Sequence, residues 1–454
     1  MQKNILTKEH IENLKDSPEQ LFSFIKSENN GRLFYLLNRL GKLSYNFDEQ
    51  PLLYALKYED PKVRYLTVKN LAKLSKFSLL NIYKKILRDD TSANVRREAV
   101  SAIGRLRNPK TITFLIELLQ DSDPEIIMQA IRGLLIFKNN ELVSEELKKL
   151  ENHPNEIIQD VIRKEFYSQT IKKTNIKHVD FPEFLKNKIV CGDVQKIMKY
   201  VPDESVHLTF TSPPYYNARD YSIYQSYKQY LDFLENTFKE VHRITKEGRF
   251  FVLNTSPIII PRVSRQHSSK RYPIPYDIHP LLVRMGWEFI DDIIWIKPEA
   301  SVKNRNAGFL QHRKPLGYKA NSRTEMVMVY RKKTDKLIDW NIRQYDWNTV
   351  KNSKVNEEYE TSNIWEIDPV FDRTHSAVFP IELCNRVIKF YSYKNDLVFD
   401  PFAGSGTFGK AALKLERYFF LTEQNKRYFN RIKENIGENK DIFYKEFKKE
   451  KQLN

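Results

Sequence analysis

A short segment of polar, rigid and aromatic residues follows an apolar run at residues 206–210. It reads Thr-Ser-Pro-Pro-Tyr and begins at Thr211. Two adjacent prolines end a β-strand and hold the neighbouring backbone carbonyls in fixed positions. A hydroxyl and a carbonyl can accept hydrogen bonds from an amino group, and a tyrosine ring offers a face for stacking. The segment is therefore a candidate catalytic tip, formed by Ser212, Pro213, Pro214 and Tyr215.

A second unusual segment, VFDPFAGSGTFG, lies at residues 398–409. The whole chain has only 13 glycines, and three of them fall in this segment. Glycine after a strand lets the backbone pass close to a ligand. A lone glycine-rich turn is weak evidence, whereas the complete run Asp-Pro-Phe-Ala-Gly-Ser-Gly-Thr is a much more specific signal of a binding site.

The elements that must position these segments alternate between strands and helices from Asn187 onward. Helices are expected at 227–245 and 406–416. Strands are expected at 188–193, 206–210, 249–254, 289–297, 325–332, 395–400 and 418–423. This alternation predicts a doubly wound α/β sheet, whose sites form at the carboxyl ends of the strands.

Both segments resemble motifs of the amino-group DNA methyltransferases. The glycine-rich run resembles the S-adenosyl-L-methionine motif, and Thr-Ser-Pro-Pro-Tyr resembles the catalytic motif. The catalytic motif comes first, as in the β group of this family. The resemblance covers roughly residues 185–440. It implies a Rossmann-like methyltransferase fold, S-adenosyl-L-methionine as cofactor, and methyl transfer to a base flipped out of double-stranded DNA.

The resemblance also implies which residues bind the cofactor. Asp193 resembles an acid that meets the adenine, Glu423 lies where an acid binds a ribose diol, and residues 374–380 resemble a segment that packs beside the cofactor. Each has a simpler interpretation: a turn cap, a surface acid and a core segment. The full set is Asp193, Thr211, Phe379, Pro380, Asp400, Pro401, Phe402, Ala403, Gly404, Gly406, Thr407 and Glu423.

Serine at position 212 favours N4 of cytosine as the target, because the Ser-Pro-Pro-Tyr form resembles the N4-cytosine enzymes. Asp-Pro-Pro-Tyr is the commoner adenine form, so N6-adenine methylation stays open, as do RNA or another amine acceptor. An alternative of another class is a catalytically silent nucleic-acid-binding scaffold. The resemblance further implies the modification component of a restriction-modification system, with a cognate restriction endonuclease as a candidate partner. No cluster of His, Cys and acidic residues has metal-ligand spacing, so no metal site is expected.

The chain is strongly basic, with a formal net charge of +17 over 454 residues, which indicates a polyanionic partner. Two basic segments rich in loop-forming residues, 261–273 and 297–323, are predicted to be loops that bind DNA phosphates. A target-recognition segment is expected at 331–362. The cations assigned to DNA binding are Arg262, Arg265, Lys270, Arg271, Lys303, Arg305, Arg313 and Lys314.

Helical repeats are predicted before the sheet. Four similar segments align with Val63, Val95, Ile126 and Ile157 at intervals of 32, 31 and 31 residues, and a further unit is expected around residues 31–43. The pattern resembles HEAT-type repeats, which stack into a solenoid; an ordinary helical bundle is the alternative. This domain is predicted to extend the DNA footprint, with a protein-docking role or a purely stabilising role as alternatives. Its candidate cations are Lys84, Lys85, Arg88, Arg96, Arg97, Arg105, Arg107 and Lys110.

The expected organisation is a HEAT-like domain at 1–168, a linker at 169–184, a catalytic domain at 185–440 and a charged C-terminal tail at 441–454. No run of residues is long and apolar enough to span a membrane, and the polar start of the chain is unlike a secretory signal. Only two cysteines occur, Cys191 and Cys384. These features favour a reducing, cytoplasmic setting with no membrane partner.

Overall fold

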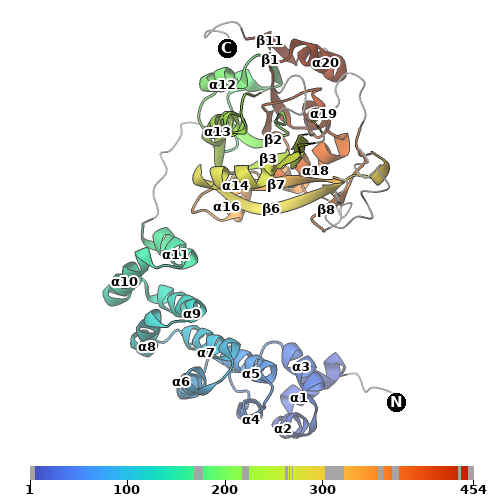
Figure 1. Ribbon diagram of the computed structural model, residues 1–454. Coiled ribbons are helices and arrows are strands. Elements are labelled where there is room, and N and C mark those ends of the chain that lie inside the picture. The colour runs from blue at the N-terminus through green and yellow to red at the C-terminus, as the bar shows by residue number, and fades with distance from the viewer. Residues whose placement is uncertain are drawn as a thin grey trace. The chain divides into compact units, whose positions relative to one another are not determined.

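The computed structural model describes residues 6–167, 177–216, 224–260, 264, 266–267, 269–301, 322–355, 361–370, 378–437 and 441–447. Contacts divide the chain into two units, Met1–Thr170 and Ile171–Asn454 (Figure 1). Residues 177–184, which fall in the predicted linker, pack on the second unit: the ring of Phe181 contacts His207 and Tyr418. In the part of the chain that the structure describes, no helix is long and apolar enough to cross a membrane.

The first unit is a stack of helical hairpins. Its first helices are α2 (Pro18–Ser27), α4 (Gln50–Ala55), α6 (Leu80–Asp89), α8 (Ile112–Glu117) and α10 (Glu141–Lys148), with α1 (Lys8–Asp16) before them. The second helices are α3 (Asn30–Arg39), α5 (Pro61–Lys73), α7 (Ala93–Arg105), α9 (Pro124–Leu134) and α11 (Glu156–Phe166). The unit expected around residues 31–43 is present as α2 and α3, which pack on α4 and α5 of the next repeat, respectively.

The register of the fourth repeat differs from the predicted one by one residue. Ile158 is buried, whereas Ile157, the expected core residue, is 59% exposed. In α5, α7 and α9 the buried residue lies three positions after the helix N-cap, as Val63 does after Asp60. Asn155 caps α11 and accepts hydrogen bonds from the backbone N–H groups of Ile157 and Ile158. The same spacing from this cap therefore selects Ile158.

Neighbouring repeats are joined by two bidentate ion pairs. Arg64 of α5 donates to both carboxylate oxygens of Asp90 at 2.7 and 2.9 Å. Arg97 of α7 donates to Asp123, the N-cap of α9, at 2.8 and 3.0 Å. Parallel double hydrogen bonds of this kind fix orientation as well as distance, so these pairs hold the stacking of the hairpins.

The second unit is built on a nine-stranded mixed sheet. Its order is β11-β1-β10-β9-β2-β3-β7-β6-β8, and β7 alone runs antiparallel to its neighbours among these strands. The strands are β1 (Lys188–Cys191), β2 (Val206–Thr211), β3 (Thr245–Thr255), β6 (Trp287–Ile296), β7 (Thr324–Lys332), β8 (Ile364–Glu366), β9 (Leu397–Asp400), β10 (Tyr418–Glu423) and β11 (Phe443–Glu446). The predicted doubly wound α/β sheet is confirmed.

Helices cover both faces of the sheet, and each face has its own apolar core (Figure 1). The helices α12 (Val194–Ile197), α13 (Tyr227–Ile244) and α14 (Ile274–Arg284) pack in one core. The helices α18 (Ile381–Tyr391), α19 (Thr407–Lys414) and α20 (Lys426–Ile436) pack in the other. The strands between these layers are buried on both faces, as expected for a parallel sheet.

Three further sequence predictions differ from the structure. The segment 441–454 is not wholly a tail, because β11 within it pairs in parallel with β1 and adds an outer strand to the sheet. The segment 261–273 is not wholly a loop, because β5 (Lys270–Tyr272) pairs with β4 (Ile258–Ile260) in a two-stranded ribbon. Finally, β3 begins at Thr245, four residues earlier than expected, and runs through Gly248 at a φ of +67°.

The segment proposed for target recognition, 331–362, lies partly in β7 and continues into α16 (Ile338–Ile342) and α17 (Trp347–Asn352). Antiparallel β7 carries the chain to the sheet edge where β3 begins, and there Asn341 donates to the carbonyl of Gly248. That edge is opposite to the one at which β2 and β9 end. This placement of residues 331–352 disfavours a role for them in reading bases. The target-recognition role of the whole segment 331–362 stays a prediction.

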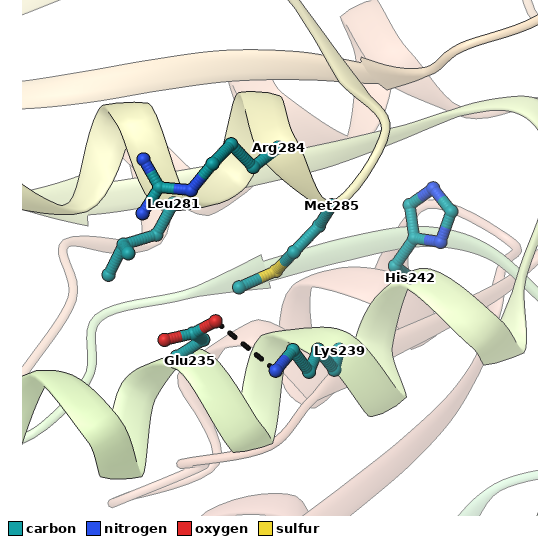
Figure 2. A pocket seen from close by; sticks show the side chains of 6 residues that line it. All are labelled: Glu235, Lys239, His242, Leu281, Arg284 and Met285. Carbon is teal, nitrogen blue, oxygen red and sulfur yellow. Dashed lines mark ion pairs between the residues drawn. The ribbon is translucent and has the colours of Figure 1, made fainter.

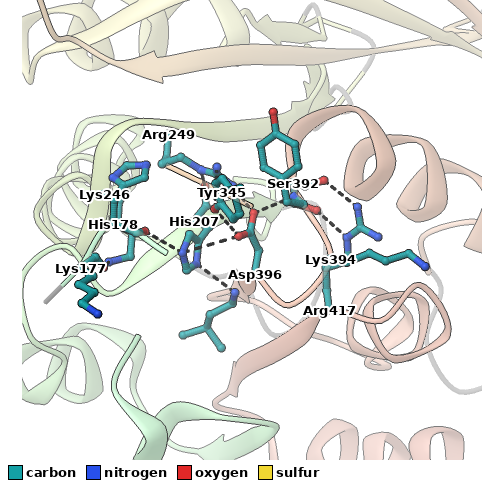
Figure 3. A network of polar contacts seen from close by, with 12 residues as sticks. Lys177, His178, His207, Lys246, Arg249, Tyr345, Ser392, Lys394, Asp396 and Arg417 are labelled. Atoms are coloured by element: carbon teal, nitrogen blue, oxygen red, sulfur yellow. Dashed lines mark hydrogen bonds and ion pairs between the residues drawn. The ribbon is translucent and has the colours of Figure 1, made fainter. Parts of the chain in front are cut away.

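A buried polar network holds β2, β3 and β9 at this opposite edge (Figure 3). Asp396 pairs with Arg249 and accepts a hydrogen bond from Tyr345 at 2.5 Å. His207 accepts from the backbone N–H of Leu397 at 3.0 Å. Burial lowers the pKa of His207 to about 3, so its ring is neutral. The network fixes the starts of the strands whose far ends carry the two motifs.

Candidate active site

The two motifs lie side by side at one edge of the sheet, which we term the carboxyl edge. It is formed by the ends of β1, β10, β9, β2 and β3, together with the end of β6 and the start of antiparallel β7. The Oγ1 atom of Thr211 donates a hydrogen bond to Oδ1 of Asp400 at 2.7 Å. This bond joins the Ser-Pro-Pro-Tyr tip to the glycine-rich turn, although 189 residues separate the two partners.

The glycine-rich turn adopts backbone conformations that favour glycine. Gly404 and Gly406 have φ values of +53° and +79°. A Cβ atom at Gly406 would lie 2.8 Å from Cγ2 of Ile432 in α20. The positive φ and the close packing of α20 therefore both require glycine at position 406. The motif had suggested only a close approach of the backbone to a ligand. Thr407 then begins α19, and its hydroxyl lies 3.1 Å from that of Ser405.

Asp400 is buried at the end of β9. Its Oδ1 atom accepts hydrogen bonds from Thr211 and from the backbone N–H of Phe402, the latter at 3.0 Å. Burial raises the pKa of Asp400 to about 7, although both hydrogen bonds act in the opposite direction. Nearby, Pro401 accepts a bond from the Thr422 hydroxyl, and the backbone N–H of Ala403 donates to the Thr422 carbonyl, so the turn is tied to β10.

Glu423 closes the glycine-rich turn from the end of β10. Its carboxylate accepts hydrogen bonds from the backbone N–H groups of Gly404 at 2.9 Å and Asn425 at 2.7 Å. Burial raises the pKa of Glu423 to about 7, and the charge of Asp400 adds to the increase. Glu423 is half-buried, and its two backbone partners distinguish it from an isolated surface acid. Each oxygen still has acceptor capacity beyond its one backbone bond.

Other residues assigned to the cofactor also have structural partners. Asp193 caps α12 by accepting from the backbone N–H of Gln195 at 2.9 Å. The backbone N–H of adjacent Gly192 donates to the Glu423 carbonyl at 3.0 Å, so Asp193 lies beside the end of β10. Phe379 stacks on Phe210 of β2 with ring centroids 4.5 Å apart. The ring of Phe402 packs 5.9 Å from that of Phe233, and Pro380 is the N-cap of α18.

These residues fit the expected cofactor, S-adenosyl-L-methionine. Asp400 and Glu423 are two acids whose pKa values are raised by burial, and a cationic ligand beside them would favour their ionised forms. The turn between them contains two glycines at positive φ. Acidic acceptors around a glycine turn suit a ligand that combines positive charge with a ribose diol.

The catalytic tip continues directly from β2. Ser212 and Tyr215 are half-buried, and Pro213 between them is buried. The Tyr215 hydroxyl donates to Oε2 of Glu325 at 3.2 Å. Tyr216 is 8% exposed and its ring packs against Tyr227, Tyr230 and Tyr272. Tyr216 therefore has a packing role in the structure.

A polar group that sequence reasoning missed surrounds the tip. It comprises Asn254 at the end of β3, Glu325 near the start of β7 and Lys297 just after β6. The Nδ2 atom of Asn254 donates to Glu325 and lies 3.4 Å from the Ser212 hydroxyl. Lys297 forms an ion pair with Glu325. No motif marks these residues; the only sequence signal is that each lies at the end of a predicted strand.

Asn254 has one unused hydrogen-bonding group. The residue is 1% exposed, and its Oδ1 atom has no hydrogen-bond partner among the described residues. A buried acceptor without a donor is costly, which makes such an atom a candidate to receive a ligand N–H group. Burial and the charge of Glu325 raise the pKa of Tyr215 well above its usual value, so its hydroxyl stays protonated.

The structure describes two of the eight cations assigned to DNA binding. Lys270 and Arg271 are exposed on β5, and the neighbouring Tyr272 ring packs on Tyr216 beside the tip. The ribbon of β4 and β5 therefore holds these two cations near the carboxyl edge. The other six lie outside the described residues: Arg262, Arg265, Lys303, Arg305, Arg313 and Lys314. β6 ends and β7 begins at this same edge, and four of these six cations lie between the two strands in the sequence.

A surface pocket elsewhere does not belong to this site (Figure 2). It lies between α13 and α14 and is lined by Glu235, Lys239, His242, Leu281, Arg284 and Met285. The lining residues come from the middle and C-terminal end of α13 and the C-terminal end of α14, the helices that lead into β3 and β6, and thus lie toward the edge opposite to the motifs. Within the described ranges, no group of three or more His, Cys, Asp or Glu residues could hold a metal ion.

Comparisons with known proteins give matches for both units of the chain. Residues 80–164 match the family model of HEAT repeats, which confirms the predicted repeats. The chain is 27% identical over 312 residues to the type II beta methyltransferase M.BslI of Bacillus sp. (strain NEB-606), covering 61% of this chain and 32% of the relative. It is 26% identical over 270 residues to the type II methyltransferase M.MwoI of Methanothermobacter wolfeii, covering 56% and 35%.

Among solved structures, a DNA modification methylase of Thermus thermophilus, complexed with S-adenosyl-L-methionine, aligns with a TM-score of 0.47 and 24% identity, covering 58% of this chain and 100% of that one. The match to the first two curated relatives spans about a third of their length. Residues 206–434, half of the chain, match the family model of the DNA methylases of N6 and N4 type. The two motifs at the carboxyl edge lie within this match, and the chain belongs to the DNA methylase family.

Proposed function

We propose that the protein is an S-adenosyl-L-methionine-dependent DNA methyltransferase whose target is the exocyclic N4 amine of cytosine. The observation that carries the proposal is the hydrogen bond between Thr211 and Asp400. It places the tip that would bind the amine next to the turn that would bind the methyl donor. A direct group transfer requires its two reactants to be held in contact in one orientation.

The cofactor, when bound, supplies an electrophilic methyl group on a positively charged sulfur. The residues that would hold it are those around the glycine-rich turn: Asp193, Asp400, Gly404, Gly406 and Glu423. Their chemistry suits the task, because buried Asp400 and half-buried Glu423 would offset the positive charge and accept hydrogen bonds from hydroxyl groups.

The tip would activate a poor nucleophile. The lone pair of an exocyclic amine is delocalised into the base ring. The Ser212 hydroxyl and the Pro213 carbonyl can accept hydrogen bonds from its N–H groups, which localises the lone pair on nitrogen. The prolines fix these acceptors before the base arrives, and such preorganisation lowers the barrier. The Tyr215 ring offers a face for a base flipped out of the duplex.

The polar group beside the tip supports this arrangement. Asn254 contacts the Ser212 hydroxyl, and Glu325 binds both Asn254 and the Tyr215 hydroxyl. Glu325 thus holds both functional side chains of the tip through hydrogen bonds. The unpartnered Oδ1 atom of Asn254 would provide a further acceptor for the target amine.

The choice of cytosine N4 is supported by serine at position 212, where adenine enzymes more commonly carry aspartate. A role as the modification component of a restriction-modification system is supported by the first two curated relatives, both described as type II methyltransferases. A cognate restriction endonuclease would then be a partner, and double-stranded DNA the substrate.

The test is a transfer assay with methyl-labelled S-adenosyl-L-methionine and plasmid DNA, followed by digestion to nucleosides. We expect the label in N4-methylcytosine. The variant Ser212→Ala should bind the cofactor normally in calorimetry but lose most transfer, whereas Ser78→Ala, at an exposed position of the first unit, should match the wild type. Label in N6-methyladenine would overturn the base assignment. Cofactor binding without transfer to any DNA would favour a silent scaffold.

A further inference from the structure

The second helices of the repeats present one continuous exposed face. α3, α5, α7 and α9 stack on one another in order, α11 follows as the second helix of the last repeat, and the buried residues of all five belong to the hydrophobic core of the unit. The ninth residue after the N-cap is exposed in α5, α9 and α11 and partly exposed in α7. In α3 the equivalent residue is the tenth after the N-cap, and it is also exposed. The face therefore has one equivalent position in each of five repeats.

Four of these five positions carry a basic residue. At the fifth, a basic residue lies one turn further along the same helix. In α7 the position is Ser101, and Arg105 from the next turn donates to its hydroxyl at 3.1 Å. The guanidinium of Arg105 thus fills the gap. We term the resulting set the cation row: Arg39, Lys69, Arg105, Arg132 and Lys164. All five members are exposed.

Most of the row is available to an external anion. Arg105 pairs with Glu98, a largely buried carboxylate, at 3.2 Å. Arg39 and Lys69 lie over the rings of Tyr35 and Tyr65, at 4.4 and 5.9 Å from the centroids. Cation–π contacts orient a basic group without neutralising its charge. Within residues 6–167, no carboxylate lies within ion-pair distance of four members of the row: Arg39, Lys69, Arg132 and Lys164.

Several of the cations in residues 84–110 that sequence analysis had assigned to DNA have other contacts, and only Arg105 among them belongs to the cation row. Arg97 forms the bidentate pair with Asp123, and Arg96 donates to the carbonyls of Asp90 and Thr91. Lys84 lies 4.2 Å from the Phe114 ring centroid. These contacts stabilise the stack and the turns, so a phosphate-binding function does not follow from the basic composition of residues 84–110 alone. The cation row, in contrast, is set by the repeat geometry.

We propose that the cation row is a second DNA-binding surface, which contacts the phosphate backbone of duplex flanking the target site. Packed helices lie roughly 8–10 Å apart, so the four stacked helices from α3 to α9 spread their part of the row over about 24–30 Å, and Lys164 on α11 extends it. That length approaches one turn of B-DNA, about 34 Å. An evenly spaced line of charges complements a regular polyanion, and each neutralised phosphate releases counterions. The inference rests on DNA being the substrate in the proposed function.

The test compares full-length variants by the salt dependence of their binding to a 40-base-pair duplex. The row variant carries Arg39→Gln, Lys69→Gln, Arg132→Gln and Lys164→Gln. Arg105 is retained because its removal would leave Glu98 unpaired. The matched control carries Lys26→Gln, Lys57→Gln, Lys85→Gln and Lys148→Gln, which remove the same charge from exposed positions on or next to the first helices. Four lost phosphate contacts should reduce the log–log salt slope by up to about 3.6, since each contributes about 0.9.

We expect a slope reduction of at least about two for the row variant, and little change for the control, with both melting at the wild-type temperature. A double variant, Lys69→Gln with Arg132→Gln, should give about half the effect. Because it changes only two side chains, it separates a loss of DNA contacts from a folding defect of the fourfold variant. Equal slopes for wild type and row variant, or equal reductions in row and control variants, would overturn the inference. Methyl transfer by the wild type in the same preparations tests the proposed function separately. A shorter footprint for the row variant would locate the lost contacts in flanking DNA.

Discussion

Replacing Glu325 by glutamine probes the polar group beside the catalytic tip. The carboxylate faces three donors: the Tyr215 hydroxyl, Nδ2 of Asn254 and the Lys297 ammonium. Glutamine has nearly the same shape but offers one acceptor oxygen and one NH₂ group. At least one donor must therefore meet another donor, and Lys297 loses its counter-charge.

The magnitude follows from the burial of the ion pair. Only 14% of the Glu325 side chain and 19% of the Lys297 side chain are exposed. Hydrogen bonds to charged groups contribute roughly 1.5–3 kcal/mol, and breaking a fully buried pair costs about 3–5 kcal/mol. Since both side chains keep some contact with water, we expect Glu325→Gln to lower the free energy of unfolding by about 2–3 kcal/mol.

The assay combines urea unfolding with steady-state methyl transfer. Because Glu325 acts through Asn254 and Tyr215, kcat should fall while KM for the cofactor changes little. The matched control is Glu288→Gln, whose carboxylate is 49% exposed and lies 3.9 Å from Arg331; it should change stability by less than about 0.5 kcal/mol. Unchanged stability together with unchanged kcat in Glu325→Gln would refute the positioning role.

Two further predictions concern the cofactor side of the carboxyl edge. Gly406→Ala should lower stability and cofactor affinity, because its φ is positive and its new Cβ atom would meet Ile432 at 2.8 Å. Gly437→Ala, at a φ of +84° and a ψ of 167° with nothing within 4 Å, should show only a conformational cost of about 1–3 kcal/mol and no loss of cofactor affinity. Thermal melts and calorimetry compare the two variants, and an equal loss of cofactor affinity in both would contradict the packing role. Asp400 and Glu423 have pKa values raised to about 7, so their folded forms hold protons that the unfolded chain releases near pH 4. Stability of the unliganded protein should therefore decline from about pH 4 to pH 7 on their account, while affinity for the cationic cofactor should rise between about pH 6 and pH 8. Calorimetry in buffers of different ionisation enthalpy should detect proton release on binding, and a pH-independent affinity without proton release would contradict these assignments.

Local sequence patterns were sufficient for much of this protein. The strand at 206–210, its stop at Pro213 and Pro214, and the glycine-rich turn after 395–400 follow from short-range rules of backbone conformation and burial. Repeats near 31-residue spacing predicted stacked hairpins because each hairpin exposes an apolar face that a neighbour must cover. In these cases the physical cause lies within a few residues of the pattern itself.

Long-range pairing of strands and packing of helices determined the features that local sequence patterns could not predict. Glu325 lies 110 residues from Tyr215 and 71 from Asn254, and the three meet only because β7 runs antiparallel and begins at the carboxyl edge. The same strand direction carries residues 333–345 to the opposite edge, away from the site for which sequence analysis had proposed them. The cation row likewise depends on the register that the helix caps impose, which selected Ile158 over Ile157. Strand direction and helix register are set by the packing of the whole domain, and no local pattern specifies them.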